Sequence, residues 1–228
     1  MVTYRLAKGH RSITIPSLIL VLLSAAWAIF KFTSSEILNF DIILFLASIL
    51  LLIFNLQFFR DPIRKSDDNF DESILAPADG VLFEIDSTSE PGISIYRIRM
   101  RFWDVHVNYM PLTGTLSSCT KKRGALFPIL PFVNKYSKNK NARQIMIFNS
   151  PLNFSFKVIQ ISGTLAYRTV AYGKIDQNFS KGDKIGMIRY GSETDLHLPT
   201  DLTNPQIKIG KKVKAGKTII AILNKNLI

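Results

Sequence analysis

The stretch ISIYRIRM at residues 93–100 decides the fold class of this chain, because its composition and length are those of a β-strand. Residues 80–85, 143–148 and 154–161 form three further segments of this kind, separated by Gly, Asn, Asp and Pro. No long stretch with helical periodicity competes with them after residue 60. We therefore expect a mostly β fold, with a β-rich sandwich or barrel-like domain.

The first 60 residues have a different composition. Residues 13–30 carry no charge, and residues 37–59 carry only Asp41. Each run is close to the ~20 residues that a helix needs to cross a bilayer. We therefore expect residues 1–60 to form a membrane-anchoring helical hairpin with these two runs as candidate spans, followed by a second domain at residues 61–228.

Pro16 and the shortness of the first run leave a re-entrant or interfacial hairpin as the alternative to a spanning one. Basic residues flank the hairpin, whereas the link between its two runs holds only Lys31 against Glu36. The flanking residues are Arg5, Lys8, Arg11, Arg60, Arg64 and Lys65. Because positive charge accumulates on the cytoplasmic side, both ends of the hairpin and the second domain are expected on that side of the cell membrane.

The charge of the chain points to an anionic partner. The 228 residues carry a formal net charge of +12, and no acidic residue lies between Lys121 and Arg143, where basic and apolar residues alternate. A membrane lipid is the favoured partner, because no nucleic-acid-binding motif accompanies these cations. The single cysteine, Cys119, indicates a reducing compartment and a site without metal.

Three short motifs hold the groups of a nucleophilic site. They are APADG at residues 76–80, DVHVN at residues 104–108 and RYGS at residues 189–192. Each one alone has an ordinary interpretation, such as a turn or a hydrogen-bonded core histidine. Together they supply a carboxylate (Asp79), an imidazole (His106) and a hydroxyl (Ser192), the groups that activate a serine oxygen when they converge.

With FRDP at residues 59–62, these motifs occur in an order that resembles the phosphatidylserine decarboxylase proenzymes, most closely the short bacterial and archaeal subclass. The resemblance runs from about Phe59 to the C-terminus. It implies that phosphatidylserine is decarboxylated to phosphatidylethanolamine and CO2. It also implies a covalent pyruvoyl group made from Ser192, with neither pyridoxal phosphate nor a metal.

The resemblance further implies self-cleavage between Gly191 and Ser192. The products would be residues 1–191 (the β chain) and 192–228 (the α chain), held together as a heterodimer. The Ser192 hydroxyl would attack the Gly191 carbonyl to form an ester, and elimination and loss of ammonia would then leave the pyruvoyl group. In this scheme Asp79 orients His106, and His106 takes the hydroxyl proton.

One residue departs from the pattern of the longer family members. Their D-x-H-x-x-H-M-P motif has a second histidine, which is linked to self-cleavage, whereas this chain has Tyr109 there. Either His106 serves both maturation and decarboxylation or another group assists, and His10 and His197 are the only other histidines. A non-catalytic lipid-binding adaptor, a decarboxylase of another amino-acid lipid and a higher homo-oligomer stay open as alternatives.

Overall fold

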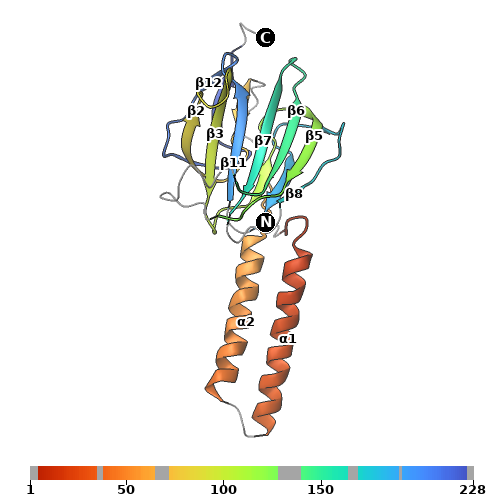
Figure 1. Ribbon diagram of the computed structural model, residues 1–228. Coiled ribbons are helices and arrows are strands. Elements are labelled where there is room, and N and C mark those ends of the chain that lie inside the picture. Colours follow the sequence, from red (N-terminus) through yellow and green to blue (C-terminus); the bar gives the residue numbers. More distant parts are fainter. Residues whose placement is uncertain are drawn as a thin grey trace. The chain divides into compact units, whose positions relative to one another are not determined.

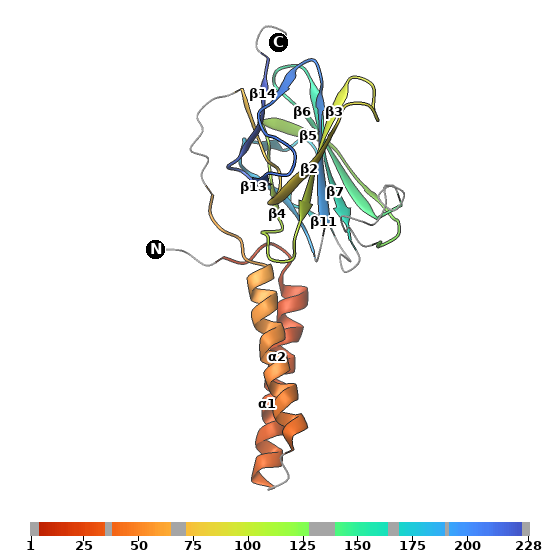
Figure 2. The ribbon, with the colours of Figure 1, turned by 90° about the vertical axis from the view of Figure 1, so that its left-hand side faces the viewer.

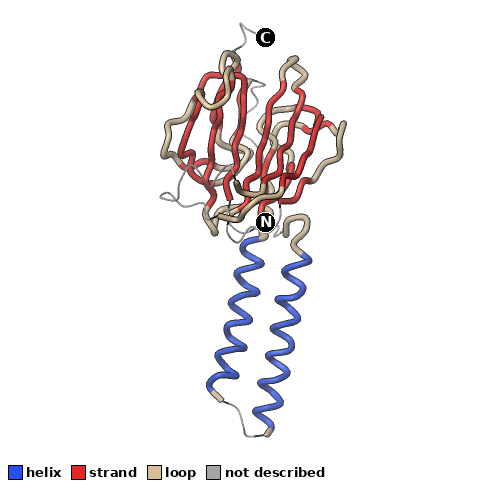
Figure 3. Tube along the Cα trace, viewed as in Figure 1, coloured by secondary structure: helices blue, strands red, loops and turns tan. Residues whose placement is uncertain are grey.

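The structure is a computed structural model that describes residues 5–34, 38–64, 72–127, 140–163, 169–189 and 192–224, with only the backbone of Ser192 included. The chain divides into two compact units, Met1–Pro62 and Ile63–Ile228. Figure 3 shows that the helices belong to the first unit and the strands to the second. Each unit is described by itself below.

The first unit is an antiparallel pair of helices, α1 (Arg11–Thr33) and α2 (Asn39–Phe58), which lie side by side (Figures 1 and 2). Both are long and apolar enough to cross a membrane. The start of α2 is capped by Asp41, whose carboxylate accepts a hydrogen bond from the N–H of Leu38 at 3.0 Å. At the other end, the N–H of Ala7 donates to the carbonyl of Phe59 at 2.8 Å and closes the hairpin.

Polar side chains lie between the two helices, and large apolar side chains face outward. The hydroxyls of Ser24 and Ser48 are 2.9 Å apart, and the indole N–H of Trp27 donates to Asp41 at 2.9 Å. By contrast, Leu23 is 64% exposed. A helical pair in water would show the reverse arrangement, whereas small and polar residues at the interface are typical of helices packed in a membrane. The hairpin therefore suggests membrane association.

The second unit is mostly β, which confirms the predicted fold class. Within the described residues, a curled eight-stranded sheet has the order β13-β2-β3-β11-β7-β6-β5-β9, and two smaller sheets have the orders β1-β14-β12 and β4-β10-β8 (Figure 1). Every pairing between named strands is antiparallel. The strands are β1 (Ser73–Leu75), β2 (Gly80–Asp86), β3 (Ile93–Met100), β4 (Val107–Tyr109), β5 (Gly114–Lys122), β6 (Arg143–Asn149), β7 (Ser155–Ser162), β8 (Thr169–Ala171), β9 (Asn178–Phe179), β10 (Lys184–Ile188), β11 (Ser192–Pro199), β12 (Thr203–Pro205), β13 (Lys212–Val213) and β14 (Ile219–Leu223).

The core lies between the eight-stranded sheet and the two smaller sheets. In β3, Tyr96 and Ile98 point into this core, while Arg97 between them lies on the opposite face. The core also takes in Ile185 of β10 and Ile220 of β14. This alternation is the period of two that a strand imposes on its side chains, and it sets the register in which β3 pairs with β11.

Candidate active site

Strand pairing brings the DVHVN motif close to the segment that leads into Ser192. Residues 107–109 form β4, which pairs with β10, and the N–H of Ile188 donates to the carbonyl of His106 at 3.1 Å. Ser192 follows Ile188 by four residues, so its Cα lies within roughly 14 Å of the Ile188 Cα. Two motifs that are about eighty residues apart in the chain are thus neighbours in the fold.

The backbone of Ser192 is held on both sides. It is the first residue of β11 and lies opposite Met100 of β3 and Ser162 of β7. Met100 is also the last residue of β3, and from there a short turn leads to His106. The structure describes only part of the predicted cleavage site: it includes the backbone of Ser192, but neither the side chain of Ser192 nor Gly191.

The imidazole of His106 is fully buried and held in one tautomer. Its Nδ1 is 2.8 Å from the carbonyl oxygen of Asp104. A carbonyl oxygen only accepts hydrogen bonds, so Nδ1 carries the proton and the lone pair of the neutral ring is on Nε2. The turn is fixed in addition by Arg101, whose N–H donates to the Asp104 carboxylate at 2.8 Å. In its neutral form, a histidine whose Nδ1–H is held in this way presents Nε2 as the basic nitrogen that a general base requires.

Asp79 is almost completely buried, and several donors hold its carboxylate. Arg64 donates through both terminal guanidinium nitrogens, Nη1 and Nη2, with Nη2 at 2.8 Å from Oδ2. The N–H of Ala215 donates to Oδ1 at 2.8 Å, and the N–H of Val105 donates to Oδ2 at 3.4 Å. Val105 directly precedes His106, so the structure joins Asp79 to the histidine segment through the backbone of Val105.

Tyr109, which stands in place of a second histidine, is a buried packing residue with 1% of its surface exposed. The guanidinium carbon of Arg64 lies 5.3 Å from the centre of the Tyr109 ring. On another side the ring closely approaches Gly216, where an added Cβ would come within 2.9 Å of Cδ1. Tyr109 therefore supports the arginine that holds Asp79.

A buried polar network connects the APADG and DVHVN motifs to β11, the strand that begins at Ser192. The Asn108 side-chain amide donates to the carbonyl of Pro77 at 3.2 Å and to the hydroxyl of Thr194 at 3.1 Å. Gln160 in turn donates to the Asn108 carbonyl oxygen at 2.7 Å. Asn108, Gln160 and Thr194 are fully buried, so each of these hydrogen bonds offsets a large desolvation cost. The sequence alone does not mark Gln160 or Thr194, and it marks Arg64 only as a flanking cation.

The two other histidines lie elsewhere. The ring of His10 is 2.8 Å from the hydroxyl of Thr14 in the first unit. In the second unit, His197 Nδ1 is 3.0 Å from Glu90 Oε2. His197 follows Ser192 by five positions in the same strand, a separation of roughly 17 Å. Burial lowers the pKa of His197, and the hydrogen bond to Glu90 opposes this shift.

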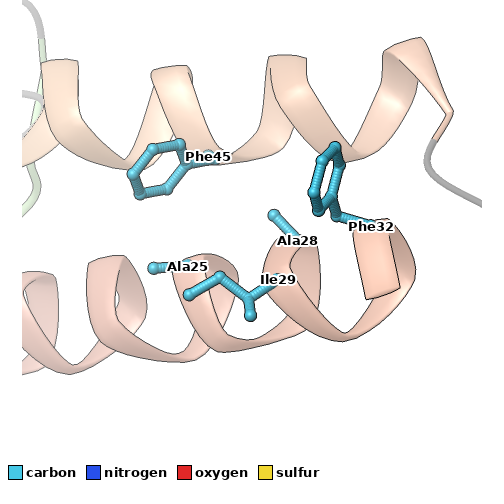
Figure 4. Close-up of a pocket in the computed structure, with 5 residues that line it drawn as sticks. All are labelled: Ala25, Ala28, Ile29, Phe32 and Phe45. Carbon is cyan, nitrogen blue, oxygen red and sulfur yellow. The ribbon is translucent and has the colours of Figure 1, made fainter. Parts of the chain in front are cut away.

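The first unit contains a pocket with a volume of about 360 Å³ whose lining side chains cannot act in catalysis. It lies between α1 and α2 and is lined by Ala25, Ala28, Ile29, Phe32 and Phe45 (Figure 4). All five are apolar, so they provide neither an acid nor a base. The candidate catalytic groups all belong to the second unit.

Comparison with known proteins gives consistent matches over most of the chain. A family model described as phosphatidylserine decarboxylase matches residues 51–221, a range that contains the three motifs. A putative archaetidylserine decarboxylase proenzyme from Methanosarcina barkeri is 37% identical over 175 residues, which cover 77% of this chain and 80% of the relative. Phosphatidylserine decarboxylase proenzymes from Wolbachia pipientis and Chlorobium limicola are each 33% identical, and the matches cover 74% and 76% of this chain and 75% and 81% of those relatives.

Proposed function

Because this chain belongs to the phosphatidylserine decarboxylase family, we propose that it converts phosphatidylserine to phosphatidylethanolamine and CO2 after cleaving itself between Gly191 and Ser192. The family resemblance expected from the ordered motifs is confirmed, and the chain is an enzyme. The observation that carries the finer proposal is the pairing of Ile188 with His106, which joins the histidine motif to the strand segment before Ser192.

The proposed substrate class is a phospholipid with a serine head group. The names of the relatives divide between phosphatidylserine and archaetidylserine, which share serine and differ in the rest of the lipid. Of eight similar proteins, six are named for phosphatidylserine and two for archaetidylserine. A decarboxylase of another amino-acid lipid is the rival that a head-group assay distinguishes.

Self-cleavage begins at the Ser192 hydroxyl. His106 Nε2 accepts the hydroxyl proton as Oγ attacks the Gly191 carbonyl carbon, and the proton then passes to the departing Ser192 nitrogen. The products of this step are an ester and a free amine. Loss of the Ser192 Cα proton and cleavage of its Cβ–Oγ bond release Gly191 as a carboxylate, which keeps Oγ, and leave dehydroalanine. Tautomerisation, addition of water and loss of ammonia yield the pyruvoyl group.

The surroundings of Ser192 fit such a group. Residue 192 is paired with Met100 and Ser162, so a new chain end at this position would keep its place in the sheet. When formed, the pyruvoyl carbonyl supplies the electron sink for the charge that decarboxylation leaves on the substrate Cα. Buried His106, with its proton on Nδ1, offers Nε2 for proton transfer in both maturation and turnover.

We assign Asp79 the role of orienting His106. Its carboxylate accepts the N–H of Val105, and Arg64 and Ala215 keep it in place. The orienting effect would thus pass through the backbone next to the histidine. In this scheme Tyr109 is a support for Arg64 and takes no part in proton transfer.

The hairpin would anchor the enzyme in the membrane that holds its substrate, with the second unit on the cytoplasmic side. This sidedness is inferred from the basic residues that flank the hairpin. The anionic lipid would then be both substrate and surface partner, and the cleaved α and β chains would form a heterodimer.

Intact-mass spectrometry of the purified, active chain tests this proposal. We expect residues 1–191 and a fragment of 37 residues (228 minus 191) whose N-terminus is blocked by pyruvoyl. A Ser192→Ala chain serves as the uncut control. Active material that consists of intact chain would refute self-cleavage, and an uncut chain that binds lipid without releasing CO2 would be an adaptor.

A further inference from the structure

The turn between β3 and His106 exposes two large aromatic side chains. Phe102 is 45% exposed and Trp103 is 64% exposed, although Met100 just before them is buried in the core. Apolar surface of this size costs free energy in water unless another surface covers it.

The turn that carries these side chains is well held. The N–H of Asp104 donates to the carbonyl of Arg101 at 2.9 Å, and Arg101 Nη2 donates to the Asp104 carboxylate at 3.2 Å. The guanidinium carbon of Arg101 lies 5.3 Å from the centre of the Trp103 ring. An indole beside a cation is typical of the membrane–water interface, where the ring lies at the level of the lipid head groups.

Cations and apolar side chains gather at the same end of the eight-stranded sheet. Lys122 at the end of β5 pairs with Arg143, Arg143 pairs with Ile161, and Ile161 pairs with Glu193, the neighbour of Ser192. The segment that follows β5 therefore leaves the sheet at the Ser192 end. The exposed residues here include Lys122, the last residue of β5, and Arg123, Leu126 and Phe127 after it, of which Phe127 is 43% exposed.

We propose that Phe102 and Trp103, with the exposed cations Lys122 and Arg123, form a second membrane contact that docks the Ser192 end of the sheet on an anionic lipid bilayer. The charge of the patch complements such a bilayer, because basic residues near the surface are attracted to its anionic head groups. The second unit begins five residues after α2 ends, so the chain can extend only roughly 18 Å between them. Any bilayer that holds α2 is therefore within reach of the unit's first residue.

This inference rests on the proposed function for the identity of the lipid, and it adds how the lipid would reach the site. Met100 pairs with Ser192 and is adjacent to the aromatic turn. Docking of Trp103 would place Ser192 close to the lipid head groups, separated from them by the turn that follows Met100. A serine head group could then be decarboxylated without extraction of the whole lipid from the bilayer.

Fluorescence quenching tests the contact without relying on activity. The chain has two tryptophans, so Trp27→Phe leaves Trp103 as the only indole. The full-length variant is reconstituted into vesicles of phosphatidylglycerol and phosphatidylcholine whose acyl chains are brominated. We expect the bromine to reduce Trp103 emission about twofold or more, because an interfacial ring lies against the acyl boundary.

A matched reporter at the other end of the sheet provides the control. Leu152 lies in the turn between β6 and β7 and is 42% exposed. In the variant Trp27→Phe/Trp103→Phe/Leu152→Trp, the bromine should leave the emission unchanged. Equal quenching of both reporters, or no quenching of Trp103, would overturn the proposal. A third result would be that Trp103 in detergent is shielded from aqueous iodide and loses this shielding when the protein is diluted. That result would also overturn the proposal, because a second copy of the chain would then cover the ring.

An activity ratio provides a second readout. For Phe102→Ser/Trp103→Ser, the rate on vesicle phosphatidylserine relative to the rate on a monomeric short-chain phosphatidylserine should fall about tenfold. Leu152→Ser should keep the wild-type ratio, and the same ratio in both variants would contradict docking. Quenching of Trp103 in a chain that decarboxylates no lipid would instead refute the proposed function and leave the contact standing.

Discussion

Arg64 and Asp79 form a buried bidentate ion pair, in which Nη2 of the arginine donates to Oδ2 at 2.8 Å and Nη1 donates to Oδ1. The same Nη1 also donates to the carbonyl of Ala215 at 2.8 Å. Arg64 and Asp79 belong to residues 1–191, and Ala215 belongs to residues 192–228. After the proposed cleavage this cluster would therefore connect the two chains beside the candidate catalytic histidine.

Removing the guanidinium should impair both stability and maturation. Arg64→Gln leaves the buried Asp79 carboxylate without its cation, a change that costs about 3 kcal/mol in buried pairs. We expect self-cleavage to slow roughly tenfold or more, measured as the uncut fraction over time at a temperature where the variant is folded. Lys208→Gln, at an exposed cation, is the matched control. Cleavage of Arg64→Gln at the wild-type rate would show that Asp79 needs no arginine.

Substitution of the proposed base or its orienting carboxylate should leave the chain uncut. In His106→Ala the lone pair on Nε2 is lost, and in Asp79→Asn the carboxylate that accepts the N–H of Val105 becomes an amide. Intact-mass spectrometry should find only the full-length chain in both. His197→Gln should be processed normally, because His197 lies roughly 17 Å along the strand from Ser192. Normal processing of both His106→Ala and Asp79→Asn would refute the triad.

We expect the ring of Tyr109 to contribute more to stability and to self-cleavage than its hydroxyl does. Tyr109→Phe keeps an aromatic face under Arg64, so we expect cleavage within about twofold of wild type. Tyr109→Ala should lower the free energy of unfolding by about 3 kcal/mol, because it opens a cavity in the core. Thermal unfolding and cleavage kinetics separate the two effects. A stable Tyr109→Phe chain that stays uncut would make the hydroxyl the missing second catalytic group.

The two products of cleavage should stay associated. Residues 192–199 pair with β3 on one side and β7 on the other, and β14 lies between β1 and β12. The pairings of β11 with β3 and β7, and of β14 with β1, are ladders of backbone hydrogen bonds that join the two fragments. We expect the 37-residue fragment (228 minus 191) to co-elute with residues 1–191 in mild detergent and to separate only in denaturant. Its loss in mild detergent would contradict this interwoven arrangement.

Acid should destabilise the second unit through His197 and Glu90. Burial lowers the pKa of His197 from 6.5, and the hydrogen bond from Lys157 lowers the pKa of Glu90 from 4.5. As pH falls, each group is protonated in the unfolded chain before it is protonated in the folded one. The stability from neutral His197 is therefore complete above pH 6.5 and is lost below it, and that from Glu90 is lost below pH 4.5.

The unfolding temperature measured between about pH 7 and pH 5 should thus decline with acid, and less steeply in His197→Gln. Burial is the largest cause of the lowered pKa of His197; Lys157 and Arg97 add to it, whereas the hydrogen bond and the charge of Glu90 oppose it. Equal slopes for wild type and variant would mean that His197 titrates normally in the folded chain.

The sequence by itself determines the features that depend on local composition. The alternation in residues 93–100 is enough to predict a strand, and the apolar runs are enough to predict two membrane-length helices. The ordered motifs are enough to identify the family, and the family model that matches residues 51–221 confirms it. They also select Ser192, His106 and Asp79 as the residues to test.

Only the tertiary structure decides what these residues touch. The contact of Asp79 with Arg64 and Ala215, and that of Asn108 with Gln160 and Thr194, joins residues far apart in the chain. Such pairs depend on strand order and register, which no local pattern specifies. The same is true of the tautomer of His106 and of the exposed aromatic turn, because both arise from how β3 ends beside the start of β11. The motifs thus specify which candidate groups are present, and the pairing of the strands specifies how these groups are arranged.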